Sequence, residues 1–229
     1  MVEIKNISFG YSDEILHDVS FTFKSGLLYF LLARNGSGKS TLFQLIAQDL
    51  RPYAGHISVS GKVTLHRQNP VYFEDMTVKE NVECFLELLD TNARYPDLKA
   101  KYQLEGIENK VARKLSGGEK QRLYLAITGM SDDEIQLYDE ADAALDAVSR
   151  KMYYTEVLKR NAADGKLVIA ISHHISEGLK YADKICLMSN KTLYELDPIA
   201  LPPELADMNE DKIMEYLEKE CDKHEETDC

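Results

Sequence analysis

One short stretch constrains the fold of this chain more than any other feature, and it reads Ala33-Arg34-Asn35-Gly36-Ser37-Gly38-Lys39-Ser40-Thr41. It follows an apolar run from Leu27 to Leu32, which only Tyr29 interrupts, as expected of a buried strand. Apolar residues at helical spacing come after it, namely Leu42, Leu45, Ile46 and Leu50. This order of strand, glycine-rich loop and helix is the context that a phosphate-binding loop needs.

The chemistry of such a loop follows from its residue types. Glycines allow successive backbone N–H groups to turn inward around an anion, and the positive end of the next helix adds to the attraction. We expect Lys39 to reach the β- and γ-phosphates of a nucleotide and the Ser40 hydroxyl to ligate Mg²⁺. The predicted nucleotide-binding residues are Asn35, Gly36, Ser37, Gly38, Lys39, Ser40 and Thr41.

The first position of the loop departs from the usual pattern. Glycine normally stands six residues before the lysine, and this chain has Ala33 there. Alanine costs little where the backbone φ is negative, but roughly 1–2 kcal/mol where the turn needs a left-handed residue. The alternative interpretation of the whole stretch is an ordinary Gly/Ser turn before a buried helix.

Composition narrows the classes of function. The net charge of −12 argues against a nucleic-acid partner, because binding to a phosphate backbone depends on Lys and Arg. No apolar run approaches the roughly 20 residues that span a bilayer, and the amino terminus lacks the features of a signal peptide. The four cysteines have no metal-ligand spacing. We expect a soluble cytoplasmic protein that does not insert into a membrane directly.

The chain alternates strands and helices on both sides of a helical stretch. Strands are predicted at 2–9, 19–24, 56–60 and 62–65, and again at 135–139, 167–172, 184–189 and 192–196. The helical stretch between them begins near residue 70, and Thr77 and Glu80 form a predicted capping box within it. This alternation predicts an α/β fold with a mainly parallel sheet covered on both faces.

We predict one domain over residues 1–203, with a helical subdomain inserted at about 70–130, and an acidic tail over 204–229. The tail carries eleven acidic residues and three lysines, a net charge of −8. Apolar residues at near-helical spacing predict an amphipathic helix in it, namely Leu205, Met208, Ile213, Leu217 and Cys221. The sequence leaves open whether this helix is solvated or serves dimerisation or docking.

Two motifs downstream supply polar groups to a phosphate site. Leu115-Ser116-Gly117-Gly118-Glu119 begins a predicted helix, where Ser116 is a candidate N-cap and Gly118 would let the backbone approach a phosphate closely. The apolar strand 135–139 ends in two acids. Asp139 would hold Mg²⁺ through water, and Glu140 would act as base or polariser toward an attacking water. A plain Ser-Gly-Gly turn and a plain acidic strand end are the structural alternatives.

Two single residues complete the candidate site. Gln68 follows the strand at 62–65, where its amide could contact both Mg²⁺ and the water. His173 ends the apolar strand at 167–172, where an imidazole could hydrogen-bond the γ-phosphate. Each alone would more simply be a surface or core residue, and only their order behind the phosphate loop makes them candidates. The catalytic set is therefore Glu140, His173, Gln68 and Lys39, and the metal set is Ser40, Gln68 and Asp139.

In order, these motifs and Ala144-Leu145-Asp146 resemble the ATP-binding cassette family, the nucleotide-binding subunits of ABC transporters. The resemblance covers roughly residues 2–196. It implies a P-loop NTPase fold with an antiparallel β subdomain and a small helical subdomain, ATP and Mg²⁺ as cofactors, and ATPase activity. Tyr11 then corresponds to the aromatic that stacks on adenine. Asp146 corresponds to the residue that links two sites across an interface.

The resemblance also implies partners. Cassettes of this family form head-to-tail dimers, in which Ser116 and Gly118 of one chain close over ATP held by Lys39 of the other. The helical stretch resembles the subdomain that meets a membrane-spanning permease, which would hold the protein at the cytoplasmic face of the membrane. Ala141-Asp142-Ala143 departs from the common Pro-Thr-Ser, and we expect Asp142 to add charge near the γ-phosphate.

The sequence therefore favours an ATP-hydrolysing subunit that energises transport. The alternative is a single-cassette ATPase that drives a protein assembly or regulatory step without transport. A phosphate-loop kinase would explain Lys39 but leaves Ser116 and His173 without a role. The cargo, the direction of transport and the choice between homodimer and heterodimer are not encoded in these motifs.

Overall fold

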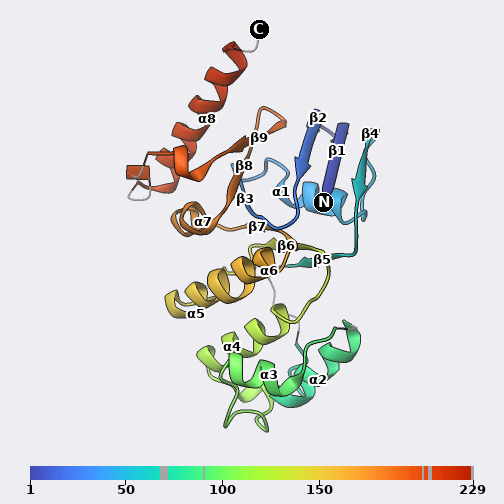
Figure 1. Ribbon diagram of the computed structural model, residues 1–229, viewed down its shortest axis with the longest axis vertical. Coiled ribbons are helices and arrows are strands. Elements are labelled where there is room, and N and C mark those ends of the chain that lie inside the picture. Colours follow the sequence, from blue (N-terminus) through green and yellow to red (C-terminus); the bar gives the residue numbers. More distant parts are fainter. Residues whose placement is uncertain (68–71, 90, 203, 206–207, 228–229) are drawn as a thin grey trace.

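The computed structural model describes residues 1–67, 72–89, 91–202, 204–205 and 208–227. Two sheets occupy the upper part of the molecule in Figure 1, and a group of helices occupies the lower end. A long helix near the carboxyl terminus leaves the top of the molecule. The predicted α/β architecture is confirmed, including the antiparallel sheet and the separate group of helices.

The larger sheet has six strands in the order β5-β6-β7-β3-β8-β9. All neighbours pair in parallel except β8 and β9, which form an antiparallel hairpin. The inner strands are apolar along almost their whole length, as strands covered on both faces must be. The strands are β3 (Leu28–Ala33), β5 (Val63–His66), β6 (Ile135–Asp139), β7 (Leu167–Ile171), β8 (Lys184–Ser189) and β9 (Thr192–Leu196).

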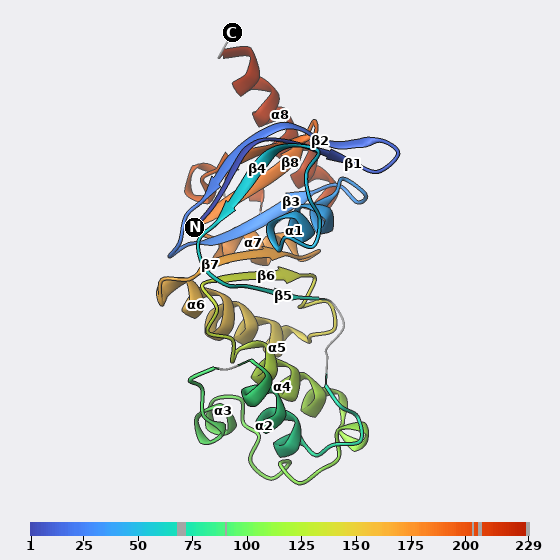
Figure 2. The same ribbon diagram turned by 90° about the vertical axis from the view of Figure 1, so that its right-hand side faces the viewer.

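A smaller antiparallel sheet covers helix α1 (Lys39–Ile46) from the other side (Figure 2). Its strand order is β2-β1-β4. Phe43 and Ile46 of α1 are fully buried in one apolar cluster with Val2 and Phe23 of this sheet and Leu31 of β3. The helix after the phosphate loop is therefore held between two sheets. The three strands are β1 (Val2–Gly10), β2 (Glu14–Phe23) and β4 (Ala54–Val59).

Strand β2 begins five residues earlier than the sequence predicts, at Glu14 rather than Val19. Asp18 has a φ of 48°, and the register between β1 and β2 shifts along the pair. Such bulges interrupt the alternation of apolar and polar residues, which is the pattern that predicts a strand. The first part of β2 therefore does not show this pattern.

The helices at the lower end are α2 (Val78–Leu88), α3 (Tyr95–Lys101) and α4 (Gly117–Thr128), with a 3₁₀ turn, η1, at Ala112–Lys114. The predicted capping box is present at the start of α2. Thr77 Oγ1 accepts from the Glu80 N–H at 3.2 Å, and Glu80 Oε2 accepts from the Thr77 N–H at 2.7 Å. The backbone N–H groups of Thr77 and Glu80, which have no acceptor within the helix, are satisfied in this way.

A continuous helix follows β6 and contains a π-helical segment. It consists of α5 (Ala147–Met152), the π segment Tyr153–Lys159 and α6 (Arg160–Ala163). Asn161 on α6 donates to Gln136 Oε1 at 2.6 Å, and Tyr138 donates to the same oxygen at 2.6 Å. A buried polar network thus explains the glutamine in an otherwise apolar strand, because each buried polar group needs a partner.

The carboxyl-terminal part contains α7 (Ile175–Tyr181), a 3₁₀ turn, η3, at Pro198–Ala200, and α8 (Glu210–Thr227). The acidic tail contains a helix from Glu210 onward, so Ile213, Leu217 and Cys221 of the predicted apolar set lie on it, whereas Leu205 and Met208 precede it. Ile213, Leu217 and Cys221 are buried in the same apolar cluster as Leu32 of β3 and Leu187 of β8. The apolar face of α8 thus packs on the two strands that lie beside the phosphate loop.

This docking predicts a stability cost for Leu217→Ala. Leu217 is fully buried, so the change should remove about 2–5 kcal/mol from the free energy of unfolding. Denaturant unfolding checks this, with Leu88→Ala, at a 64% exposed position, as the control that should change little. Equal unfolding curves for both variants would show that α8 does not pack as described.

Candidate functional site

The phosphate loop connects the carboxyl end of β3 to the amino end of α1. Gly36 and Gly38 have φ values of 78° and 103°, in the left-handed region that favours glycine. Gly38 is the N-cap of α1, and no described side chain caps the helix there. The Ser37 hydroxyl oxygen is buried and has no hydrogen-bond partner among the described residues. The first turn of α1 thus keeps its N–H groups for an anion, and Ser37 adds a polar group without a partner.

Gly38 is also required for steric reasons. A Cβ at this position would lie 2.2 Å from Ile15 Cγ2 and 3.2 Å from Met188 Cε. Ile15 belongs to β2, so the smaller sheet packs directly against the loop. Tyr11 lies in the turn between β1 and β2, four residues before Ile15, and its side chain is 66% exposed. Its ring makes an edge contact with Phe9, with the centroids 5.3 Å apart.

Ala33 fits the loop without left-handed strain. It is the last residue of β3, pairs with Met188 of β8, and is not among the described non-glycine residues with positive φ. The condition under which alanine costs little is therefore met. The departure from the usual glycine leaves the geometry of the loop intact.

The Lys39 ammonium group lies over the start of its own loop. Its Nζ donates to the Ala33 carbonyl at 2.9 Å and to the Arg34 carbonyl at 3.3 Å. Burial lowers the pKa of Lys39, and the nearby carboxylates of Glu140 and Asp139 oppose this shift. The lysine is thus held at the loop between carbonyl dipoles and the acidic end of β6.

Parallel pairing brings the polar ends of three strands to one edge. Asp139 of β6 pairs with Ile171 of β7, and β3 pairs with the other side of β7. His173 Nε2 lies 2.9 Å from Glu140 Oε1. Both side chains remain partly exposed, 52% for His173 and 24% for Glu140. The structure therefore places Lys39, Asp139, Glu140 and His173 around the carboxyl edge of the sheet.

The backbone of Glu140 is left-handed, with a φ of 51°. Its N–H donates to the Ile171 carbonyl at 3.0 Å, which fixes the turn that follows β6. A non-glycine residue in this region costs on the order of 1–2 kcal/mol. The fold tolerates this cost at the residue that carries the carboxylate next to His173.

Asp142 is buried and does not present its carboxylate at the surface of the site. Its side chain is 1% exposed and accepts hydrogen bonds from Ser172 Oγ at 2.6 Å and Tyr154 at 3.1 Å. Ser172 Oγ in turn accepts from the His174 N–H at 2.9 Å. Asp142 therefore ties the turn after β6 to the turn that carries His173, and its charge is not at the surface of the site. A single sequence carries no signal for this role, because it does not show which face of the turn is buried.

Ser116 and Gly118 lie at the start of α4, in the group of helices at the other end of the molecule from α1 (Figures 1 and 2). Ser116 is the N-cap and forms a capping box with Glu119. Lys110 Nζ lies 2.7 Å from Glu119 Oε1, and this hydrogen bond, with the cap, lowers the pKa of Glu119 to about 2. No described atom lies within 4 Å of a Cβ added to Gly118. The exposed motif does not meet the phosphate loop of its own chain.

Asp146 caps α5, with its Oδ1 accepting from the Ser149 N–H at 2.8 Å. Gln121 of α4 donates to the Ala144 carbonyl at 2.8 Å and accepts from Ser149 Oγ at 2.9 Å. Gln121 thus joins the Ser116 helix to the Ala144-Leu145-Asp146 turn. No local sequence pattern predicts this role of Gln121. Gln68 lies outside the described residues, so its predicted role stays a prediction.

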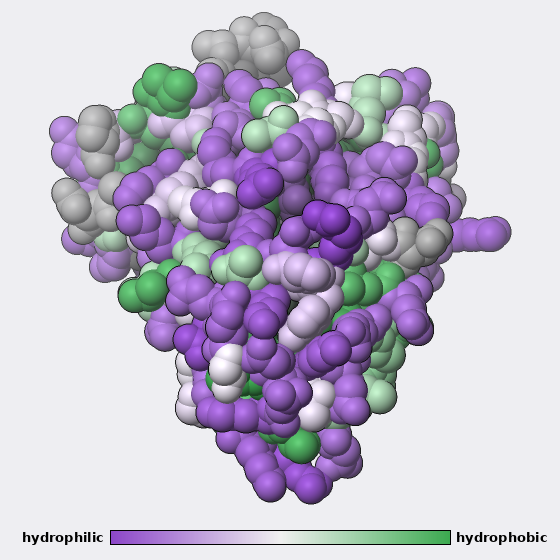
Figure 3. Space-filling view, turned by 60° about the horizontal axis from the view of Figure 1, so that its bottom comes forward, coloured by the Kyte–Doolittle hydropathy of each residue, from purple (hydrophilic) through white to green (hydrophobic). Residues whose placement is uncertain are grey.

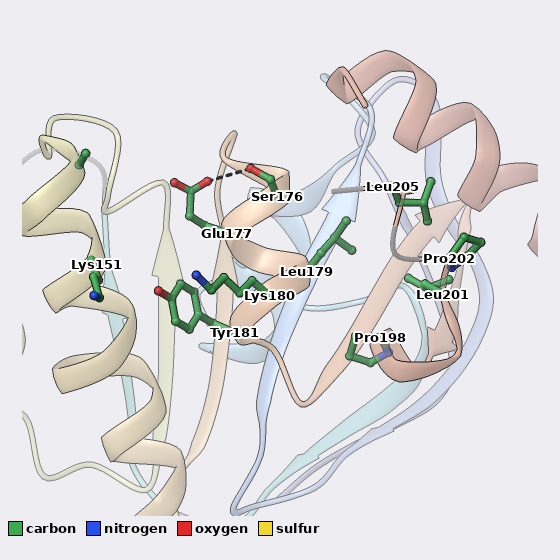
Figure 4. A pocket seen from close by; sticks show the side chains of 11 residues that line it. Lys151, Ser176, Glu177, Leu179, Lys180, Tyr181, Pro198, Leu201, Pro202 and Leu205 are labelled. Atoms are coloured by element: carbon green, nitrogen blue, oxygen red, sulfur yellow. Dashed lines mark hydrogen bonds between the residues drawn. The ribbon is translucent and has the colours of Figure 1, made fainter. Parts of the chain in front are cut away.

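Two cavities differ in chemical character. One, of about 190 Å³, is lined by the loop residues Ala33, Arg34, Asn35 and Lys39 together with His173. A larger one, of about 480 Å³, lies between α7, the start of α5 and the segment that contains Pro198 and Leu205 (Figure 4). Its walls are mostly apolar and include no candidate catalytic residue. The smaller cavity is therefore the candidate functional site.

Comparison with known proteins identifies the family. Residues 16–143 match the model of the family described as ABC transporter. The chain belongs to this family. Its curated relatives include ATP-binding proteins of import and transport systems.

Two curated relatives illustrate the similarity. The taurine import ATP-binding protein TauB of Pelagibacter ubique is 33% identical over 79% of this chain and 73% of its own length. The glycine betaine transport ATP-binding protein OpuAA of Bacillus subtilis is 31% identical over 89% of this chain. The alignment spans 53% of OpuAA, so about half of that protein has a counterpart here.

Solved structures agree on the fold. The ATP-binding subunit of an ABC transporter superposes with a TM-score of 0.74 at 22% identity, over 86% of this chain and 90% of its own. A bacterial Atm1-family ABC exporter with ATP bound gives a TM-score of 0.69 at 26% identity, over 86% of this chain and 39% of its own. These structures therefore share the fold of this chain.

The close packing of Gly38 against Ile15 can be tested by substitution. Gly38→Ala should weaken ATP binding by at least about tenfold, because left-handed strain adds to the clash with Ile15. Ile15→Ala removes the clashing group, so the double variant should recover part of the affinity. Calorimetric titration with ATP measures both. Wild-type affinity in Gly38→Ala would show that the loop is not shaped as described.

Proposed function

We propose that the carboxyl edge of the sheet binds ATP in the presence of Mg²⁺ and hydrolyses it to energise a separate membrane-spanning partner. The observation that carries this proposal is the convergence of Lys39, Asp139, Glu140 and His173 beside an uncapped helix amino terminus. The phosphates would lie in the loop over residues 33–41. Lys39 would exchange a carbonyl partner for a phosphate oxygen, since both are acceptors for its ammonium group.

The residues present fit a magnesium ion that is shared with a nucleotide. Ser40 is exposed at the start of α1, and Asp139 is partly exposed at the end of β6. Among the described residues, no three His, Cys, Asp or Glu side chains form a group that could hold a metal by themselves. This suits Mg²⁺, which commonly takes one or two protein ligands and completes its shell with substrate phosphates and water. The ion would supply charge neutralisation at the phosphates.

We assign Glu140 the role of base toward the attacking water, and His173 the role of a donor that orients Glu140 and the γ-phosphate. Their 2.9 Å separation supports a direct hydrogen bond between imidazole and carboxylate. The left-handed turn holds the Glu140 backbone, so the carboxylate is directed by the fold rather than by nucleotide alone. Tyr11, exposed in the turn between β1 and β2, is the proposed stacking partner of adenine.

A second copy of the cassette, identical or related, would complete the site. Ser116 and Gly118 are exposed on the other end of the molecule, which supports a head-to-tail dimer in which they meet the ATP of the partner. Asp146, exposed at the start of α5, would lie at the same interface. We propose that ATP binding closes this dimer and that hydrolysis reopens it.

The helical end is the proposed contact with the membrane-spanning partner. Figure 3, which brings this end forward, shows a mostly hydrophilic face with small apolar groups. Phe73, Met76 and Leu88, all at least 37% exposed, belong to this part of the chain. In the described part of the chain, no helix has both the length and the apolar character needed to cross a bilayer. We propose attachment at the cytoplasmic face through the partner, because proteins similar to this chain are ATP-binding proteins of transport systems.

Glu140→Gln tests the assignment of the base. The variant should bind ATP and accumulate as a closed dimer, while its turnover falls by on the order of 10²–10⁴-fold. Phosphate release and size-exclusion chromatography with ATP and Mg²⁺ measure the two effects. Equal turnover in the variant and the parent protein would remove Glu140 from the mechanism.

A pull-down from detergent-solubilised native membranes tests the partner. Tagged Glu140→Gln with ATP and Mg²⁺ should retain a polytopic membrane protein in stoichiometric amount, identified by mass spectrometry. Recovery of a defined soluble partner, with no membrane protein, would instead favour an assembly or regulatory ATPase.

A further inference from the structure

The acidic helix α8 lies against the phosphate loop. The Arg34 guanidinium, in the loop itself, makes a bidentate ion pair with the Glu218 carboxylate, with both N–O distances 2.7 Å. Paired geometry of this kind is more directional than a single surface contact. The backbone carbonyl of Arg34 is one of the two that hold Lys39. One residue therefore connects α8 to the lysine of the nucleotide site.

Three acidic residues of α8 form a stripe toward this loop. Asp211, Glu215 and Glu218 are spaced by four and three residues, so they share one face of the helix. All three carboxylates act electrostatically on Arg34 and raise its pKa, with Glu218 the largest cause. The apolar face next to the stripe is buried through Ile213 and Leu217, which fixes its direction.

The stripe reaches the nucleotide cavity. Asp211 and Met214 line the same cavity of about 190 Å³ as Lys39, Asn35 and His173. In the proposed function, His173 marks the side of the site that holds the γ-phosphate. Asp211 lines the cavity together with His173, so its carboxylate would oppose the charge of a third phosphate there in addition to that of the first two, because Coulomb repulsion acts on each phosphate.

We propose that the acidic stripe of α8 determines the nucleotide specificity of this site, by lowering affinity for ATP more than for ADP. Arg34 offsets part of the stripe charge, and Glu218 holds Arg34 away from the phosphates. This inference rests on the proposed function of the phosphate loop. It makes Asp211 and Glu218 specificity-determining residues that contact neither the attacking water nor the metal.

Charge-neutral variants test the stripe. Asp211→Asn should tighten ATP binding by about threefold to tenfold and ADP binding by less, so that the ratio of the two dissociation constants changes. Glu218→Gln should act in the same direction, because it releases Arg34. Arg34→Ala should act in the opposite direction, because it leaves the stripe charge uncompensated. Calorimetric titration with ATP and with ADP, both with Mg²⁺, measures these ratios.

Asp164→Asn is the matched control. It removes one negative charge from an exposed position between α6 and β7, at the amino end of the parallel strands and opposite the phosphate loop. The ratio of its dissociation constants for ATP and ADP should equal that of the parent protein. The stripe variants should change the ratio of the ATP and ADP dissociation constants less at about 0.5 M salt, because charge interactions are then screened within a few ångströms.

The outcomes separate this inference from the proposed function. A parent protein that binds neither nucleotide would contradict the function itself. A parent that binds ATP, with stripe variants that leave the ATP/ADP ratio unchanged or shift both nucleotides equally, would contradict only the role of α8. Should Asp211→Asn fail to fold by circular dichroism, Glu215→Gln, exposed on the same stripe, takes its place.

Discussion

The parallel pairing of β6, β7 and β3 is the constraint on which the rest of the structure depends. It aligns the carboxyl ends of strands that are separated by up to 138 residues between Ala33 and Ile171. Backbone dipoles and polar turn residues then share one edge, as in other open α/β sheets. Lys39, Asp139, Glu140 and His173 all lie at or directly after that edge, and the apolar strands beneath give these residues a rigid base.

Much of this arrangement could be predicted from the sequence because its signals are local. Apolar runs mark buried strands, and a run that ends in Asp139-Glu140 or Ser172-His173 also marks the polar edge. The glycines at 36 and 38 encode a backbone conformation directly, which the φ values confirm. The capping box at Thr77 is likewise readable from residues three apart.

Other features depend on contacts between distant residues and could not be predicted. Asp142 looked like an added charge in the site, but packing turns it inward toward Ser172 and Tyr154. Gln136 is a polar residue in a buried strand, and one of its partners, Asn161, lies twenty-five residues later. Arg34 and Glu218 are 184 residues apart. No local pattern reveals such pairs, and the roles assigned to the site residues stay predictions until they are measured.

The hydrogen bonds of Gln121 have a mechanical consequence. One side chain on α4 binds both the Ala144 carbonyl and the Ser149 hydroxyl, so the Ser116 motif and the Asp146 turn belong to one stiff unit. A displacement of α4 would therefore act on the Asp146 turn through this side chain. Two motifs with exposed residues, Ser116 and Asp146, are in this way coupled by a single amide group, that of Gln121, which lies 28 residues from Ser149 along the chain.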